Sequence, residues 1–583
     1  MTLPLSPFAP DQAAPLHVLK FGSSVLRTIE DLPVVAGEIY RQRRAGAQVI
    51  AVVSALAGET DRLLAEAEAA GRGVGTSGIA DLVSLGEERA AALLALACDR
   101  IGVPTRIFRP EELGVLTEGD PLRAHPVSLD RREIDARLAQ TGLLIVPGFV
   151  GVDASGRRTL LGRGGSDFSA IYLAGELGAR FVRLYKDVDG VFDRDPAAHS
   201  DARRYEQICW TDALKVARPL VQPQAVEYAA LRRLPIEVAQ VGALQVSRIG
   251  AVTAPTVPVG RPRRIRIGVA GFGTVGQALA ERLRAEARFE LGPILVRDVE
   301  KPRHNIAPAA LTRNADDLVD ACPDIVVDAM SCEHAGAALC ERLLEQGIDV
   351  ATASKRLVST SGERLATACN AGGARLAYSA AVGGGATVLE TIERARASGD
   401  IVEISATLNG TTNFILGELA GGRSLADALA EAQRAGFAEA NSDFDLSGAD
   451  AAAKLQIIAH HAFDIAPGTL PVATEWLDAD TAARIAASGE RWVQLARITR
   501  SAGAVSASVT LVPLPEVPDL PFGPGEWNGV LIGLADGSSR HCLGRGAGGA
   551  ATAEAIVADL YDLVAARLAD ADVDELLLEA VPA

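Results

Sequence analysis

Two glycine-rich stretches, Leu161-Gly-Arg-Gly-Gly-Ser-Asp167 and Gly271-Phe-Gly-Thr-Val-Gly276, decide how this 583-residue chain folds. Each stands between apolar residues and an amphipathic segment, so each predicts a turn that joins a β-strand to an α-helix. Glycines in such a turn let backbone amides approach a phosphate closely, and the helix that follows presents its positive end. The sequence therefore predicts two separate phosphate-binding sites in one chain.

Strand and helix signals alternate around both turns. Residues 27–46 have the spacing of an amphipathic helix, and residues 48–56 and 142–151 have the apolar character of buried strands. A new strand, Ile265–Ala270, opens a second series of the same kind. Such alternation predicts an α/β protein with parallel sheets covered by helices. After about residue 390, alternating strands and Ala-rich helices indicate a further domain of mixed α+β type.

Composition limits the classes of function. At about 150 residues per domain, 583 residues suggest three or four domains. A net charge of −17 argues against binding of nucleic acid or of anionic membranes, so small molecules are the expected partners. Neither a secretory leader nor a run of about 18 apolar residues occurs, so we expect a cytoplasmic protein. The seven cysteines have no metal-ligand spacing, which predicts reduced thiols.

The second glycine stretch matches G-x-G-x-x-G in the setting that dinucleotide binding requires, between an apolar strand and an amphipathic helix. Its members are the expected cofactor contacts: Gly271, Phe272, Gly273, Thr274, Val275 and Gly276. The next strand ends in Arg297 and Asp298, where an arginine would bind a 2′-phosphate and a carboxylate would bind ribose hydroxyls. Arg297 favours NADP(H), with NAD(H) as the alternative.

Seven motifs follow in order, and together they resemble homoserine dehydrogenase over about residues 265–570. They are GFGTVG, Ala353-Ser-Lys-Arg-Leu-Val358, Ala380-Ala-Val-Gly-Gly-Gly385, Leu408-Asn-Gly-Thr-Thr-Asn-Phe-Ile-Leu416, Gly436-Phe-Ala-Glu439, Asp445-Leu-Ser-Gly-Ala-Asp-Ala-Ala-Ala-Lys454 and Gly544-Arg-Gly-Ala-Gly548. One departure is Ser354, which stands where the family usually has asparagine.

This resemblance implies hydride transfer between NAD(P)H and the aldehyde of aspartate semialdehyde, with a cationic acid protonating the forming alkoxide. Lys355 follows a predicted strand, and Asp450 and Lys454 share one face of a helix because they are four residues apart. Two lysines that meet at one oxygen would depress each other's pKa. By the resemblance, Lys355 and Lys454 are catalytic, and Asp450 and Glu439 hold the amine and hydroxyl groups of the substrate.

The same resemblance implies further contacts. It assigns Asp445, Thr411 and Thr412 to the substrate and Gly546 to the cofactor. It also implies a possible site for Na⁺ or K⁺ at the backbone carbonyls of Val382 and Gly384.

A second set of motifs resembles the aspartokinase branch of the amino acid kinase family, over about residues 17–225. The first glycine stretch is not a Walker P-loop, because it lacks G-x-x-x-x-G-K-[ST]. The motifs are Val18-Leu-Lys-Phe-Gly-Ser-Ser24, Val52-Val-Ser-Ala-Leu-Ala-Gly-Glu-Thr-Asp61, Gly86-Glu87, Pro147-Gly-Phe-Val-Gly151, LGRGGSD and Lys186-Asp-Val-Asp-Gly-Val-Phe-Asp-Arg-Asp-Pro196.

This resemblance implies phosphorylation of aspartate to 4-aspartyl phosphate by ATP, with Mg²⁺ bridging the phosphates and held largely by substrate and water. Lys20 would stabilise the γ-phosphate, and Asp167 would organise the phosphoryl-transfer site. The implied aspartate contacts are Thr60, Glu87, Arg163 and Ser166. The resemblance implies that the nucleotide pocket is bordered by the segment Lys186-Asp-Val-Asp-Gly190, which contains Asp187 and Asp189, and by Asp195.

The two resemblances set the expected domain boundaries. These are a flexible tail (1–16), an aspartokinase-like amino acid kinase domain (17–250), a linker (251–264), an NAD(P)-binding Rossmann domain (265–390), and an α+β homoserine dehydrogenase catalytic and dimerisation domain (391–583) whose C-terminal end returns to the cofactor cleft. Both families usually form homo-oligomers, so we expect a dimer or tetramer.

The sequence predicts a bifunctional enzyme of the aspartate pathway, which leads to threonine and methionine. The alternative is a homoserine dehydrogenase fused to a degenerate, non-catalytic kinase-like binding or structural module. That alternative is motivated by Ser23, Ala90 and Pro219, which stand where the kinase family usually has glycine, serine and lysine, unless Arg218 substitutes for that lysine. Paired ACT regulatory domains do not lie between the two halves, so feedback inhibition by threonine through them is not expected.

Overall fold

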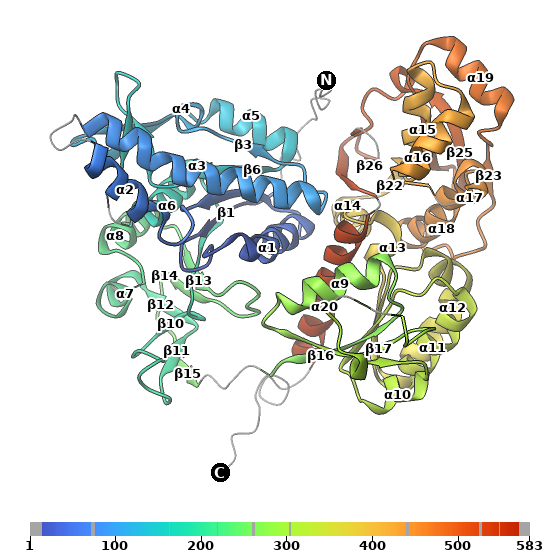
Figure 1. Cartoon of the computed structure of the whole chain (residues 1–583), viewed down its shortest axis with the longest axis horizontal. Helices are drawn as coiled ribbons and strands as arrows, with labels where there is room; N and C mark the ends of the chain where they lie inside the picture. Colours follow the sequence, from blue (N-terminus) through green and yellow to red (C-terminus); the bar gives the residue numbers. More distant parts are fainter. Residues whose placement is uncertain are drawn as a thin grey trace. The chain divides into compact units, whose positions relative to one another are not determined.

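The computed structural model describes residues 14–70, 76–162, 164–217, 220–258, 263–301, 303, 305–435, 437–438, 442–523, 527–546 and 548–570. The chain divides into two compact units. The N-terminal unit comprises Gln12–Asp99 and Pro104–Arg263, and the C-terminal unit is formed chiefly by Arg264–Asp572. In Figure 1 the first runs from blue to green and the second from green to red.

An eight-stranded sheet forms the centre of the N-terminal unit, in the order β12-β14-β13-β9-β1-β2-β6-β3. All neighbouring pairs are parallel except β13 with β14. The strands are β1 (Leu16–Phe21), β2 (Gln48–Val53), β3 (Arg106–Ile107), β6 (Leu143–Pro147), β9 (Phe181–Tyr185), β12 (Gln207–Cys209), β13 (Ile236–Ala239) and β14 (Ser247–Gly250). The central strands are nearly continuous apolar runs, as expected when both faces of a parallel sheet are covered.

Helices cover both faces of this sheet. Helix α6 (Gly165–Leu177) lies on one face, where it contacts β1, β2 and β9, and α1 (Leu32–Arg44) lies on the other. Most α6 side chains are buried, which fits a helix that is apolar all round. The remaining helices are η1 (Ile29–Asp31), α2 (Glu59–Ala70), α3 (Thr76–Arg100), α4 (Pro110–Leu113), α5 (Arg132–Thr141), α7 (Trp210–Val216) and α8 (Pro223–Arg232).

Two small sheets complete the N-terminal unit. One contains β4 (Val115–Glu118), β5 (His125–Leu129), β7 (Val150–Val152) and β8 (Arg158–Leu160), and the other contains β10 (Val191–Phe192), β11 (Arg203–Tyr205) and β15 (Thr256–Pro258). Strand β15 lies inside the segment 251–264, which was expected to be a linker. It pairs antiparallel with β11, and Arg203 donates hydrogen bonds to the hydroxyl and carbonyl of Thr256.

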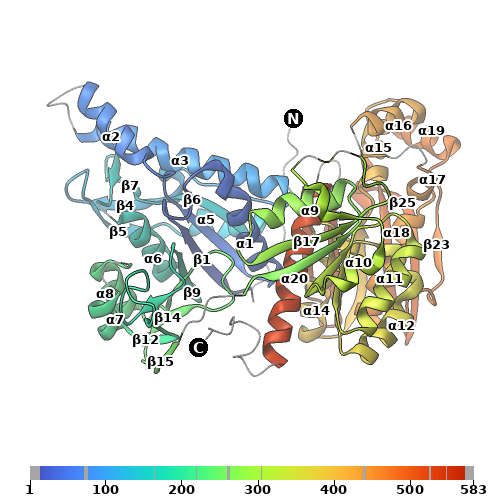
Figure 2. The ribbon, with the colours of Figure 1, turned by 60° about the horizontal axis from the view of Figure 1, so that its bottom comes forward.

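A six-stranded parallel sheet opens the C-terminal unit, in the order β18-β17-β16-β19-β20-β21. Its strands are β16 (Ile265–Ala270), β17 (Phe289–Leu295), β18 (Leu311–Thr312), β19 (Ile325–Asp328), β20 (Asp349–Thr352) and β21 (Leu376–Ala377). Figure 2 shows this sheet between two helical layers. One layer has α9 (Thr274–Arg284) and α20 (Gly549–Asp570), and the other has α10 (Ala315–Asp320), α11 (Glu333–Glu345) and α12 (Lys355–Gly372).

A second six-stranded sheet follows, in the order β23-β25-β24-β22-β26-β27, and it is antiparallel except for β23 with β25. Its strands are β22 (Ile401–Thr407), β23 (Val472–Thr474), β24 (Trp492–Ser501), β25 (Ala504–Pro513), β26 (Trp527–Leu534) and β27 (Ser539–Arg545). Helices α14 (Val388–Ser398) and α18 (Ala449–Phe463) pack against it. The other helices here are η2 (Pro308–Ala310), α13 (Ser379–Gly383), α15 (Gly410–Ala420), α16 (Leu425–Arg434), α17 (Asp443–Leu446), α19 (Ala479–Ser488) and η3 (Leu514–Glu516).

One apolar core joins the two sheets of the C-terminal unit. It contains Val326 and Leu357 from the parallel-sheet part together with Ile404 and Ile458 from the antiparallel part. The last helix, α20, returns to lie beside α9 (Figure 1). Continuous burial of this kind makes the two parts of the unit fold as one body.

Two whole-chain expectations can be compared with the structure. The structure has all seven cysteines free, and their reduced state stays a prediction. In the part of the chain that the structure describes, the longest apolar helices remain too short or too polar to span a bilayer.

Candidate active sites

The second glycine stretch forms a tight turn between β16 and α9. Gly271 has φ +98°, and a Cβ atom there would lie 2.5 Å from the carbonyl oxygen of Ala329. A Cβ atom at Gly276 would lie 2.4 Å from the carbonyl oxygen of Gly271, so both positions require glycine. Gly273, the N-cap of α9, faces open space. The turn therefore leaves room for a phosphate at the N-terminus of the helix.

A cavity of about 820 Å³ lies beside this turn. Of the predicted cofactor contacts, Gly271, Phe272, Gly273 and Arg297 line it, whereas Thr274, Val275 and Gly276 lie in the first turn of α9 and do not. Charged side chains gather at its wall: Arg297, Asp298, Lys301, Arg303 and Arg313. The predictions did not include the last three. The sequence could have indicated these three residues, because they are basic and follow the strand β17.

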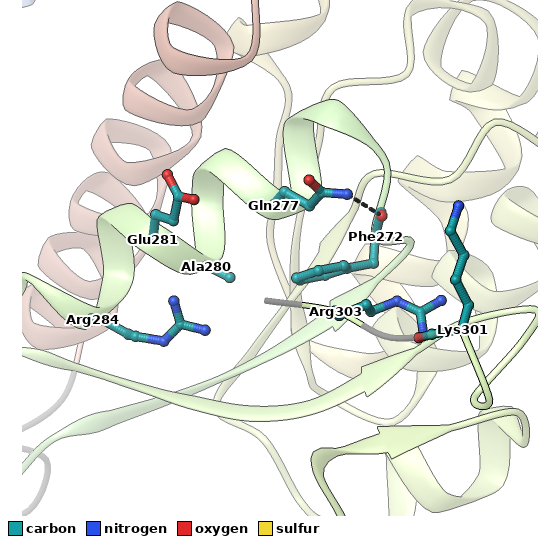
Figure 3. A pocket seen from close by; sticks show the side chains of 7 residues that line it. All are labelled: Phe272, Gln277, Ala280, Glu281, Arg284, Lys301 and Arg303. Atoms are coloured by element: carbon teal, nitrogen blue, oxygen red, sulfur yellow. Dashed lines mark hydrogen bonds between the residues drawn. The ribbon is translucent and has the colours of Figure 1, made fainter. Parts of the chain in front are cut away.

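Phe272, Lys301 and Arg303 also line a second cavity, of about 170 Å³, on the side of α9 (Figure 3). The Arg303 guanidinium lies 5.8 Å from the centre of the Phe272 ring, a distance at which the cation is attracted to the ring. Gln277 donates a hydrogen bond to the Phe272 carbonyl. The Phe272 ring and the Arg303 side chain therefore pack against each other at the edge of the larger cavity.

Asp328, the last residue of β19, connects the loops that follow β19 and β20 through hydrogen bonds. Its Oδ1 accepts a hydrogen bond of 3.1 Å from the amide of Met330, and its Oδ2 accepts one of 2.8 Å from the hydroxyl of Thr352. The Thr352 hydroxyl in turn accepts a hydrogen bond of 3.0 Å from the amide of Ser354. Burial raises the pKa of Asp328, which is 1% exposed. Asp328 therefore fixes two loops at the carboxyl edge of the sheet.

Ser354 is the N-cap of α12, and its hydroxyl accepts a hydrogen bond from the amide of Leu357. Serine is among the preferred N-cap residues, so the departure from asparagine keeps the cap. Helix α12 begins directly after it with Lys355. The predicted position of Lys355 after a strand at the carboxyl edge is confirmed by β20.

The carboxylate of Asp450 is held between the two predicted catalytic lysines. Lys355 forms an ion pair with its Oδ1, and the Nζ atom of Lys454 lies 3.0 Å from its Oδ2. Lys454 also donates a hydrogen bond of 2.5 Å to the carbonyl of Leu408. The side chains of Asp450 and Lys454 are buried, whereas that of Lys355 is 31% exposed. Lys355 is therefore the member of the group most open to a ligand.

Burial and charge act against each other in this group. Burial alone would raise the pKa of Asp450, but the ammonium groups of Lys454 and Lys355 outweigh it, and the pKa is lowered. The pKa of Lys454 is lowered by burial and by the charge of Lys355, although Asp450 raises it. The group therefore holds an ionised carboxylate beside a lysine that gives up its proton more readily than a solvated one.

Asn409, which the predictions did not include, connects this group to the neighbouring loop. Its Nδ2 donates hydrogen bonds of 2.9 Å to Asp445 and 3.2 Å to Asp450. Its Oδ1 caps α15 by accepting from the amide of Thr412. The signal in the sequence was an asparagine before Gly-Thr-Thr, which is typical of an N-cap. Burial raises the pKa of Asp445.

The hydroxyl groups of the two predicted threonines already have backbone partners. Thr411 donates to the carbonyl of Phe437 at 2.6 Å, and Thr412 donates to the carbonyl of Asp445 at 3.0 Å. In this conformation both side chains position loops around the lysine group. A contact of either one with substrate stays a prediction.

The turn that contains Val382 and Gly384 packs against the end of β27. The amide of Gly385 donates a hydrogen bond of 2.7 Å to the carbonyl of Arg545, and a Cβ atom on Gly384 would lie 2.7 Å from the carbonyl oxygen of Gly546. Gly546 is therefore placed beside this turn. The monovalent cation at Val382 and Gly384 stays a prediction, and Glu439 lies outside the described residues.

In the N-terminal unit, Lys20, Asp167 and Lys186 form a second buried charged group. The Nζ atom of Lys20 lies 2.6 Å from Oδ1 of Asp167, and Lys186 donates a hydrogen bond of 2.7 Å to Oδ2. Burial opposes ionisation of Asp167, but both lysines outweigh it, and its pKa is lowered. Sequence reasoning placed Lys186 only in a segment bordering the nucleotide, and it missed this contact.

The loop after β1 keeps the glycine that lies against Lys20. A Cβ atom on Gly22 would lie 2.5 Å from the Nζ atom of Lys20, whereas Ser23, which stands where the kinase family has its second glycine, is exposed. A side chain is therefore accommodated at position 23 without displacing the lysine. Ala90 is fully buried, and Pro219 lies outside the described residues.

Three of the four predicted aspartate contacts lie in the described part of the N-terminal unit. Glu87, on α3, is 2% exposed, and burial raises its pKa to about 7. Its Oε1 accepts a hydrogen bond from the amide of Ala55. Thr60 lies at the start of α2 and Ser166 in the first turn of α6, next to Asp167. Arg163 lies outside the described residues.

The predicted nucleotide-side aspartates follow β9. Asp189 forms an ion pair of 3.4 Å with Arg204, and the carbonyl of Asp187 accepts a hydrogen bond from Gln240. Asp195 is exposed and accepts from the amide of Ala197 in a surface turn. Asp187 and Asp189 therefore lie between β9 and β10, and Asp195 lies beyond β10.

Comparison with known proteins gives matches to both units. Residues 15–234 match the amino acid kinase family, residues 271–379 match the NAD binding domain of homoserine dehydrogenase, and residues 388–561 match homoserine dehydrogenase. These matches confirm both resemblances and the predicted fold class.

Individual known proteins are similar to parts of this chain. An aspartokinase of Pseudomonas aeruginosa is 36% identical over 226 residues, which are 38% of this chain and 55% of that protein. A homoserine dehydrogenase of Corynebacterium glutamicum is 34% identical over 332 residues, which are 53% of this chain and 74% of that protein. A crystal structure of a homoserine dehydrogenase from Thiobacillus denitrificans has a TM-score of 0.47 and 30% identity, covering 56% of this chain and 77% of the other.

The chain spans only about half the length of the aspartokinases that it matches, but nearly three quarters of the homoserine dehydrogenase. It therefore belongs to the homoserine dehydrogenase family, and it carries an aspartokinase-like amino acid kinase domain ahead of its NAD-binding domain.

Proposed function

We propose that the chain is a bifunctional enzyme, which reduces aspartate semialdehyde to homoserine with NADPH and phosphorylates aspartate to 4-aspartyl phosphate with Mg-ATP. The observation that carries the first activity is the Asp450 carboxylate between Lys355 and Lys454. The group adjoins α12, which starts at the same sheet edge as the glycine turn after β16. Open α/β sheets bind ligands at this edge.

The chemistry of the reduction assigns a task to each side chain. A bound reduced nicotinamide would supply hydride to the aldehyde carbon, and the carbonyl oxygen would then need one proton. Lys355 and Lys454 carry ammonium protons next to the buried Asp450, and the lowered pKa of Lys454 favours donation of its proton near neutral pH. Asp450 and Asp445 are carboxylates that would hold the substrate ammonium group.

Preference for the phosphorylated cofactor is supported by the charges at the larger cavity. Arg297, Lys301, Arg303 and Arg313 are cationic, and Asp298 is the acidic residue among the lining side chains. An excess of positive charge favours a 2′-phosphate over a ribose hydroxyl. The glycine turn itself suits the pyrophosphate of either cofactor.

The kinase activity is supported by the group of Lys20, Asp167 and Lys186 at the start of α6. A side-chain carboxylate oxygen of aspartate forms a bond to the γ-phosphorus while the bond from that phosphorus to the bridging oxygen breaks. ADP leaves with the electron pair, and the attacking carboxylate needs no base because it is already ionised. The lysines offset negative charge on the phosphoryl oxygens, and Mg²⁺ would be held by phosphate and water oxygens.

Both activities can be tested on one preparation of the full chain. Aspartyl hydroxamate formation from aspartate, Mg-ATP and hydroxylamine measures the kinase, and NADP reduction with homoserine measures the dehydrogenase. We expect Asp167→Asn to abolish the first rate and leave the second unchanged. Asp135→Asn, at an exposed position on α5, is the matched control. A wild-type chain that oxidises homoserine but forms no hydroxamate would make the first half a non-catalytic module.

A further inference from the structure

The two oxygens of Asp167 are each occupied by a different lysine. The Nζ atom of Lys20 lies 2.6 Å from Oδ1, and Lys186 donates a hydrogen bond of 2.7 Å to Oδ2. The side chains of Lys20, Asp167 and Lys186 are only 7%, 9% and 14% exposed. The geometry is therefore that of a buried carboxylate that positions two ammonium groups side by side.

The sheet brings the two lysines together. Strands β1 and β9 are parallel neighbours, with Phe21 opposite Tyr185, so Lys20 and Lys186 lie at the same carboxyl edge. The amide of Lys186 donates a hydrogen bond of 2.9 Å to the carbonyl of Ala239, which fixes its backbone beyond the last residue of β9. The position of Lys186 is thus as firmly set by the sheet as that of Lys20.

The charges of this group do not balance. Two ammonium groups face one carboxylate, which leaves one positive charge in excess in a buried place, and burial of an unbalanced charge is unfavourable. Asp167 also lies in the first turn of the 13-residue helix α6, where the helix dipole adds further positive potential. Burial and the charge of Lys186 lower the pKa of Lys20, although Asp167 raises it. All of these features favour an anion as the ligand.

We infer that Lys186 is a second catalytic lysine of the kinase half, which contacts the transferred phosphoryl group together with Lys20. The inference rests on the kinase activity proposed above. ATP carries a negatively charged γ-phosphate, and ADP lacks this group. Lys186 should therefore contribute to binding of Mg-ATP and to the transfer step, and little to binding of Mg-ADP.

The test uses the full chain with Lys186→Met, which removes the charge and keeps the length of the side chain. Lys215→Met is the matched control, because Lys215 is 75% exposed on α7. Affinities for Mg-ATP and Mg-ADP are measured by calorimetry, hydroxamate formation gives the kinase rate, and thermal unfolding of each variant shows whether its N-terminal unit is folded. For Lys186→Met we expect affinity for Mg-ATP to fall about 10- to 100-fold relative to Mg-ADP, with a kinase rate at least about 100-fold lower.

An unchanged ratio of the two affinities in Lys186→Met, or an equal loss of both, would overturn the inference, since Lys186 would then only hold Asp167. Lys186→Arg should recover part of the ATP preference, because it restores the charge. If the wild-type chain binds Mg-ATP but forms no hydroxamate, the proposed kinase activity fails, and the affinity ratio still decides whether Lys186 contacts the third phosphate. If the wild-type chain binds neither Mg-ATP nor Mg-ADP, both the proposed kinase activity and the inferred role of Lys186 are wrong.

Discussion

The Nζ atom of Lys454 lies 3.0 Å from Oδ2 of Asp450, one helical turn away on α18, and the other oxygen of that carboxylate pairs with Lys355. One buried carboxylate thus holds two like charges in a small space. The repulsion between the ammonium groups is offset only while Asp450 is ionised. Asp450 is therefore the residue on which the geometry of both lysines depends.

Replacement of Asp450 by asparagine should remove this balance without changing the size of the side chain. We expect kcat/KM for homoserine oxidation to fall about 10²- to 10³-fold, because the lysines lose their common partner. Asp464→Asn is the matched control, since Asp464 is exposed and terminates the same helix. A loss of less than about threefold in Asp450→Asn would contradict the assigned role.

The pH dependence of homoserine oxidation should report the pKa of Lys454. Oxidation requires a neutral amine that accepts the hydroxyl proton, so kcat/KM should rise with pH and level off below the ordinary lysine pKa of 10.5, because burial lowers the pKa of Lys454. Asp450 raises that pKa, so Asp450→Asn should move the rising limb to lower pH. A limb that stays in place or moves to higher pH would exclude Lys454 as the titrating group.

Selection of NADP should depend on the cations at the larger cavity. We expect Arg297→Ala and Arg303→Ala to raise the KM for NADP about tenfold or more, with a much smaller change for NAD, because only NADP carries the 2′-phosphate. Arg364→Ala, on the exposed side of α12, is the control. Equal effects on both cofactors would assign these arginines to the pyrophosphate or to folding.

Asp328 should act as a positioning residue for the cofactor loop and for Lys355. Asp328→Ala removes the acceptor for Thr352 and Met330, and we expect kcat for homoserine oxidation to fall about tenfold. Asp328→Asn should recover most of the rate, because an amide oxygen can still accept from Thr352. The kinetics of homoserine oxidation are measured for both variants, with thermal unfolding as the control for folding of the C-terminal unit. Equal rates of homoserine oxidation in Asp328→Ala and Asp328→Asn would show that the hydrogen bond from Thr352 to Asp328 does not affect catalysis.

Local spacing explains which parts of the sites could be predicted. The pairing of Asp450 with Lys454 follows from four residues of separation on one helix, and the place of Lys355 follows from the end of a strand. The glycine turn at Gly271 has a local signature as well. These features depend on residues that are neighbours in the sequence.

Contacts between distant segments could not be predicted in the same way. Lys186 reaches Asp167 only because β9 lies beside β1, and Asn409 meets Asp450 only because α15 begins near α18. The strand β15 lies in a segment that was expected to be a linker, and it forms because its backbone pairs with the edge of β11. Strand order and helix packing decide such contacts, and hydrophobic periodicity carries no information on them.

Glu87 should make the stability of the N-terminal unit depend on pH. Burial raises its pKa from 4.5 to about 7, so the folded state binds the proton more tightly than the unfolded state. The resulting stabilisation is complete below pH 4.5 and is lost as the pH rises to about 7, with an upper limit of about 3 kcal/mol. Glu87→Gln keeps an uncharged acceptor for the Ala55 amide at every pH.

We therefore expect Glu87→Gln to raise the melting temperature of the N-terminal unit at pH 8 and to change it little at pH 4.5. Thermal unfolding of the full chain at both pH values, followed without substrates, measures this difference. Glu68→Gln is the control, because Glu68 is exposed on α2. An equal shift at both pH values would mean that Glu87 is ionised in the folded protein throughout this range, and that its burial is compensated by a partner cation.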